Sequence, residues 1–159
     1  MAIVGFEFNK IDVSKKETAK GKINISNNVG ITDIKRSDLQ LGKTKQHGIR
    51  FEFSYKSLYE PDFAKIELGG SILYLTDEKG AKEIVDSWQK DKKIKKEIAE
   101  KIINSILTKC NIQSIILSNT VNLPPPVPLP NVNVASASKA NAAEKKPEKK
   151  EEKQSSLKK

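Results

Sequence analysis

Apolar and polar residues alternate along the first half of the chain, a pattern typical of half-buried β-strands. The clearest example covers residues 49–59, where aromatic and aliphatic side chains lie on one side and polar side chains on the other. Because a buried parallel strand is apolar on both faces, the alternation favours an antiparallel strand with one solvated face. Shorter runs of the same period predict strands at residues 4–8, 23–34 and 64–75.

Two pairs of residues predict interruptions in these strands. Asn tolerates turn geometry, so Asn27-Asn28 predicts a break in the second strand. Gly69-Gly70 lies within the last strand, where paired glycines favour a bulge, a sharp bend or the close approach of another backbone over contact with a ligand.

The second half changes to a helical period. Thr76 or Asp77 is a candidate cap for a helix whose apolar residues follow i, i+3, i+4, i+7: Ala81, Ile84, Val85 and Trp88. A Lys-rich break at residues 90–93 precedes a longer helix with a wide apolar stripe over residues 94–107. A further short apolar segment, residues 112–117, fits a helix or a strand.

The last third of the chain divides into two segments of different composition. Consecutive prolines give residues 123–130, here the Pro-rich segment, an extended polyproline II path. Its apolar content favours a strap packed over the domain or an oligomer contact. Residues 133–159 contain 8 Lys and 4 Glu but few apolar side chains, which predicts a disordered tail. We therefore expect one α+β domain at residues 1–132, with a four-stranded antiparallel sheet followed by two or three helices on one face, the Pro-rich strap and the tail.

The net charge of +9 is shared between tail and domain. The tail contributes 8 − 4 = +4 and residues 1–132 the remaining +5. Only Arg36 and Arg50 are arginines, which disfavours bidentate, sequence-specific reading of nucleic acid but leaves loose association with RNA or a ribosome open. The composition of the Lys-rich tail is equally typical of an RNA- or ribosome-binding arm and of a solubilising tail.

Catalytic chemistry is scarce in this sequence. His47 and Cys110 are the only residues of their types and lie 63 positions apart. Neither Gly69-Gly70 nor Gly80 belongs to a phosphate-binding loop motif. We therefore expect a binding protein and not an enzyme, with no cofactor and no metal. A lone cysteine, no signal-like N-terminus and no long apolar run indicate a soluble, cytoplasmic protein.

Three segments of the chain resemble the SecB export chaperones and their SecB-like relatives. They are the alternating stretch Phe51-Glu52-Phe53-Ser54-Tyr55, the stretch Leu68-Gly69-Gly70-Ser71-Ile72, and the Pro-rich segment. The chain departs from that family at Lys101-Ile102-Ile103-Asn104, where an aromatic-Ala-Arg-Glu stretch is absent, and in its Lys-rich tail. The resemblance implies an ATP-independent holdase that binds unfolded polypeptides in surface grooves, serves protein export and assembles as a tetramer.

Seven residues are candidates for contact with such clients, although aromatics that recur every second residue more often face a core. They are Phe51, Phe53, Tyr55, Tyr74, Leu75, Val127 and Leu129. Two alternatives stay open from the sequence: a basic ribosome- or RNA-associated accessory protein, and an interaction module recruited through its PxxP pattern.

Overall fold

A computed structural model describes residues 2–17, 21–41 and 43–130. The chain divides into two units, Met1–Pro128 and Leu129–Lys159. The predicted disordered tail, residues 133–159, lies outside the described residues.

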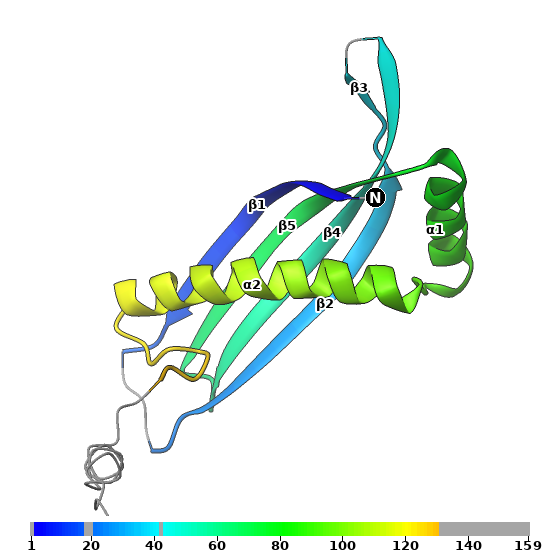
Figure 1. Cartoon of the computed structure of the whole chain (residues 1–159). Coiled ribbons are helices and arrows are strands. Elements are labelled where there is room, and N and C mark those ends of the chain that lie inside the picture. Colours follow the sequence, from blue (N-terminus) through cyan, green and yellow to red (C-terminus); the bar gives the residue numbers. More distant parts are fainter. Residues whose placement is uncertain (1, 18–20, 42, 131–159) are drawn as a thin grey trace, which may run out of the picture. The chain divides into compact units, whose positions relative to one another are not determined.

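The first unit contains an antiparallel sheet with the strand order β1-β5-β4-β2. These strands are β1 (Ala2–Lys15), β2 (Asn24–Arg36), β4 (Thr44–Glu60) and β5 (Ala64–Thr76). A fifth strand, β3 (Leu39–Leu41), pairs with the start of β4 and forms a ribbon beyond the other strands (Figure 1). The expectation of four strands was therefore wrong, because residues 39–41 pair with residues 44–46 and add a short strand.

The predicted alternation along residues 49–59 is present in the structure. Phe51 lies opposite Ile72 and Tyr55 lies opposite Leu68, and all four side chains are buried in the core. Arg50, on the other face, is partly exposed. Burial on one face only is what an antiparallel sheet covered on one side requires.

The predicted break at Asn27-Asn28 is wrong. Strand β2 is continuous there, with Asn27 opposite Ser57 and Asn28 opposite Lys56. Pairing along the ladder outweighs the turn preference of Asn, because it satisfies the backbone polar groups of both strands.

Strand β5 also continues through the glycine pair, and the irregularity lies in the neighbouring strand. The register between β1 and β5 shifts between Phe8 and Lys10, opposite Gly69-Gly70. A Cβ atom on Gly70 would lie 2.1 Å from the Glu7 carbonyl oxygen and 2.8 Å from Cζ of Phe53. Close approach by the β1 backbone and an aromatic ring therefore explains this glycine.

The structure contains two helices among the described residues. Helix α1 (Glu78–Asp91) is capped by Asp77, whose side chain accepts a hydrogen bond from the Gly80 N–H, and Lys92 follows its end in a left-handed conformation. Helix α2 (Lys96–Thr120) includes residues 112–117, so that segment is helical. The predicted break between the helices is confirmed.

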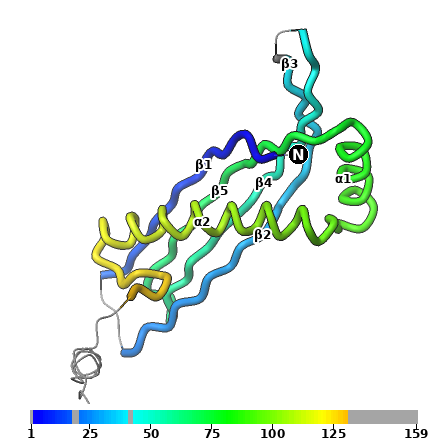
Figure 2. Tube along the Cα trace, viewed as in Figure 1, coloured from blue at the N-terminus to red at the C-terminus, as the bar shows by residue number. Residues whose placement is uncertain are grey.

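Helix α2 lies across one face of the sheet, and α1 lies beside the end of β2 from which the ribbon extends (Figures 1 and 2). An ion pair between Arg36 and Glu78 at 4.0 Å joins that end of β2 to α1. The residues of α2 that are buried follow one another at every fourth position: Ile102, Ile106, Cys110, Ser114 and Ser118. This single stripe fixes which side of α2 faces the sheet.

Candidate functional site

Helix α2 exposes isoleucines on the side that does not face the sheet. Ile112 and Ile116, one turn apart, are 56% and 53% exposed, and Ile115 between them is half-buried. Ile112 lies two positions, about half a turn, from the buried Cys110. The second half of α2 therefore presents an apolar surface to solvent, here the α2 outer patch (Ile112, Ile115 and Ile116).

The edge strand β1 carries a second partly uncovered apolar row. Phe6, Phe8 and Phe53 form a ring cluster with centroid separations of 5.0 to 6.2 Å, and Phe6 and Phe8 are only partly buried. Further along β1, Ile11 is 51% exposed. No strand pairs with the outer side of β1, so its backbone groups on that side have no ladder partner in the described chain.

The face of the sheet opposite α2 is charged. The carboxylate of Glu67 lies 2.9 Å from Nζ of Lys10 and 3.3 Å from Nζ of both Lys56 and Lys65. The hydrogen bond from Lys10, with support from the other two lysines, holds the pKa of the Glu67 carboxyl at about 2. Since opposite charges on this face are paired, it is a solvated surface and not a concentrated anion-binding patch.

Side chains from three strands hold the Pro-rich segment and the residues before it. Tyr59 on β4 donates its hydroxyl to the Pro124 carbonyl at 2.7 Å, and Asn27 on β2 donates its amide to the Pro126 carbonyl at 2.7 Å. Lys15, at the end of β1, donates to the carbonyls of residues 121 and 122 at 2.8 and 3.3 Å. The ends of three strands are thus joined to one segment. It bends at Pro126 and Val127, so it is not the uniformly extended path that its prolines predicted.

Buried polar groups orient these donors. Ser57 donates to Oδ1 of Asn27 at 2.7 Å, which fixes the amide with its nitrogen towards Pro126. Ser57 also lies 3.1 Å from the Tyr55 hydroxyl, which donates to Asn111 on α2 at 3.3 Å. Burial raises the pKa of Tyr59 to about 12, so this hydroxyl keeps its proton over the physiological range.

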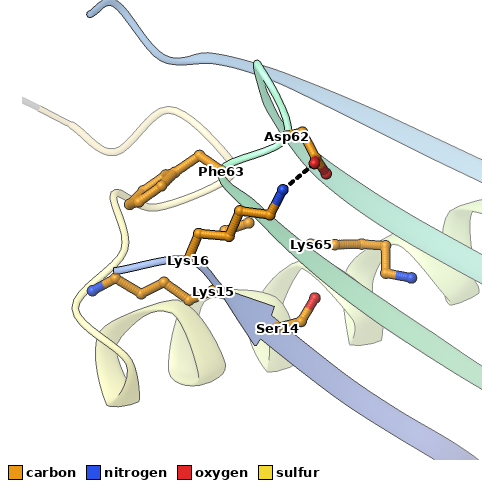
Figure 3. Close-up of a pocket in the computed structure, with 7 residues that line it drawn as sticks. Ser14, Lys15, Lys16, Asp62, Phe63 and Lys65 are labelled. Carbon is orange, nitrogen blue, oxygen red and sulfur yellow. Dashed lines mark hydrogen bonds and ion pairs between the residues drawn. The ribbon is translucent and has the colours of Figure 1, made fainter. Parts of the chain in front are cut away.

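A shallow cavity of about 270 Å³ lies at the same end of the sheet (Figure 3). Lys15, Lys16 and Lys65 line it together with Asp62 and Phe63, and Lys16 forms an ion pair with Asp62. Ser14 also lines it, and the lysines are engaged elsewhere: Lys15 by backbone carbonyls, Lys16 by Asp62 and Lys65 by Glu67.

His47 and Cys110 lie in separate surroundings. Nδ1 of His47 is 2.9 Å from the Arg36 guanidinium and 3.6 Å from Asp38, at the base of the ribbon. Cys110 is fully buried, and burial raises the pKa of its thiol to about 12. Within the described part of the chain, no three His, Cys, Asp or Glu side chains are grouped as metal ligands would be. Neither helix described is long and apolar enough to cross a membrane.

The seven candidates predicted for client contact lie in different environments. Leu75 and Val127 are partly exposed, and Leu129, in the second unit, is 48% exposed. The other four are buried in the core: Phe51, Phe53, Tyr55 and Tyr74. Their contact with a client stays a prediction.

The sequence did not single out the apolar side chains that the structure exposes most. Besides Leu129, these are Val4, Ile11, Ile25, Ile112 and Ile116. The available signal was that Ile112 and Ile116 lie one turn apart, so that they share one side of any helix formed by residues 112–117.

Comparison with known proteins identifies no family for this chain. No family model matches it, and no curated protein matches its sequence. Among solved structures, it is similar to the Mycobacterium tuberculosis Rv1957 SecB-like chaperone, in a complex with a ChAD peptide from the Rv1956 HigA1 antitoxin. The two share 9% identity with a TM-score of 0.47, over 83% of this chain and 90% of the other.

Proposed function

We propose that this protein is an ATP-independent holdase, a binding protein and not an enzyme, that captures non-native polypeptides. The observation that carries the proposal is the α2 outer patch: two isoleucines more than half exposed, one turn apart, on a helix whose opposite side is fully packed. Each apolar side chain of a client that covers this surface gains roughly 1.5 to 3 kcal/mol. Such contacts require neither nucleotide nor metal.

Charge supports the same role. The α2 outer patch follows a first half of α2 with several charged residues, and the opposite face of the sheet carries paired ions. Charged residues beside an apolar patch keep the protein soluble while the patch remains available to apolar segments. We further propose a cytoplasmic role in protein export and assembly from several copies, as the sequence resemblance to SecB implies.

The residues that the sequence predicted for client contact contribute less to this proposal than the α2 outer patch. Leu75 and Val127 are accessible enough to extend a client contact. Phe51, Phe53, Tyr55 and Tyr74 would meet a client only if the packing over the sheet opened, because they are buried.

Suppression of aggregation of a chemically unfolded model protein, without ATP, tests the proposal. The native chain should suppress light scattering at a stoichiometric excess, and the double variant Ile112→Ser/Ile116→Ser should lose most of that effect. The matched control is Lys109→Ser/Thr120→Ser, which changes exposed polar residues of the same helix. Absence of suppression by the native chain, or equal suppression by both variants, would refute the assignment.

A second candidate function is association with RNA or a ribosome. The net charge of +9 and the exposed Lys43 and Lys45 on the β3–β4 ribbon favour it. Binding to total RNA should then weaken steeply with salt and decrease when residues 133–159 are removed. RNA binding that neither salt nor truncation changes would exclude an electrostatic role for the tail.

A further inference from the structure

The Pro-rich segment cannot be held to the sheet as a strand. Proline has no backbone N–H, so residues 124, 125, 126 and 128 offer carbonyl acceptors but no donors. All of the hydrogen bonds that fix Pro124 and Pro126 come from side chains of the sheet, one from Tyr59 and one from Asn27. Side-chain donors from the sheet are therefore what holds this donor-free backbone, which bends at Pro126 and Val127.

Apolar contacts complete the recognition. Leu123 and Pro126 are buried, whereas Pro124, Pro125 and Pro128 face solvent. Two anchors thus alternate with exposed prolines along the segment, next to the two carbonyls that accept hydrogen bonds. A peptide that follows the same bent path, with a leucine and a proline at the same spacing, would present the same two apolar groups and the same two acceptors.

The receptor side is preorganised. Tyr59 is 1% exposed, and Ser57 is fully buried and holds Oδ1 of Asn27, so that the amide nitrogen points towards the segment. Fixing these donors in advance removes part of the entropy that a bound peptide would otherwise cost. The three residues come from two neighbouring strands, β2 and β4, and do not depend on the Pro-rich segment for their positions in the sheet.

We propose that Asn27, Ser57 and Tyr59 form a binding site for proline-bearing peptides, which residues 123–128 of the chain's own Pro-rich segment occupy as an internal ligand. The site consists of residues of β2 and β4 and includes no residue of the α2 outer patch, and it does not require holdase activity. Because the internal ligand is joined to α2 through only two residues, its effective concentration is high, and a peptide in solution has to compete with it. Weakening the internal ligand should therefore open the site.

A labelled peptide with the sequence of residues 121–130, followed by fluorescence anisotropy, is the probe. The full-length variant Leu123→Ser/Pro126→Ser keeps the site but weakens its occupant, and should bind the probe at least tenfold more tightly than the native chain. Adding Tyr59→Phe to this variant removes one donor and should weaken binding about fivefold. The matched control adds Tyr74→Phe, a buried tyrosine elsewhere in the core, and should leave probe binding unchanged.

Circular dichroism establishes that each variant is folded, and the milder variant Pro126→Ser replaces the double variant if that one unfolds. The proposal is overturned if the folded, weakened variant binds the probe no better than the native chain, or if Tyr59→Phe and Tyr74→Phe have equal effects. Aggregation suppression measured on the same proteins separates this result from the holdase: the Ile112→Ser/Ile116→Ser variant should lose suppression and still bind the probe like the native chain.

Discussion

The pKa values of two carboxyl groups in this protein are changed more by neighbouring charges than by burial. Glu67 is buried, which by itself raises a carboxyl pKa, yet the three lysines around it lower its pKa from 4.5 to about 2. Asp38, at the base of the ribbon, likewise has a pKa of about 2, chiefly because Arg36 donates to it. Cys110 shows the opposite influence, since burial alone raises its pKa.

The shift at Glu67 predicts how stability depends on pH. A carboxyl whose pKa is lowered by folding stabilises the folded state above its unfolded pKa, and this contribution disappears as the pH falls from about 4.5 towards 2. Glu67→Gln should therefore be less stable than the native chain at pH 7, and the difference should vanish near pH 2. Urea unfolding at low salt across this range measures it. The exposed Glu60→Gln is the control, and a Glu67→Gln deficit that stayed constant with pH would contradict the argument.

Because Cys110 is buried, we predict that its thiol reacts slowly with thiol reagents in the native protein. The thiolate is the reactive form, and neither access nor ionisation is available in the native fold at pH 8. Ellman's reagent should leave the native chain unmodified over an hour and modify one thiol per chain within minutes in guanidinium chloride. Rapid reaction of the native protein would show that α2 separates readily from the sheet.

At the scale of elements, α2 combines two functions along one helix. Its buried stripe holds it to the sheet, while the α2 outer patch is free in the described structure. The second half contains small polar residues in the buried stripe, Ser114 and Ser118, whose hydroxyls donate back to helix carbonyls at 3.0 and 2.8 Å. Small side chains at these positions let the helix lie close to the neighbouring elements.

The same substitution at two isoleucines of this helix, six residues apart, should lower the free energy of unfolding by very different amounts. Ile106→Ala removes a fully buried side chain and should cost about 2 to 5 kcal/mol of unfolding free energy. Ile112→Ala removes an exposed one and should change it by less than about 0.5 kcal/mol. Urea unfolding followed by the fluorescence of Trp88, the single and buried tryptophan, compares them. Equal losses would mean that the Ile112 side chain is covered in solution.

At the scale of the whole molecule, the sequence predicted order and type of most elements but not their exposure. Alternation identified residues 49–59 because one face is buried, and Asp77 was recognisable because a cap acts locally. The short strand β3 was missed, since residues 39–41 are too few to show an alternating pattern before their pairing is known. Which isoleucines of α2 face solvent depends on how the helix lies on the sheet, and Ser114 and Ser118, which belong to its buried stripe, are of a residue type that is mostly exposed in proteins.

The two edges of the sheet differ in a way that predicts where copies of the chain meet. The β2 edge is partly engaged, because Asn27 binds the Pro-rich segment and Arg36 pairs with α1. The β1 edge has no strand beyond it in the described chain and exposes Ile11. If the protein assembles from several copies as proposed, an added strand at β1 would satisfy the unpaired backbone groups and cover this side chain.

Light scattering after gel filtration should therefore give a multiple of the single-chain mass for the native protein. Ile11→Lys places a charge at the free edge and should lower that mass at micromolar concentration, since burying an unpaired ammonium opposes association. Ile25→Lys makes the same change on β2 and should leave the mass unaltered, so that it controls for added charge. A single-chain mass for the native protein would contradict assembly, and loss of mass in both variants would place the contact elsewhere than the β1 edge.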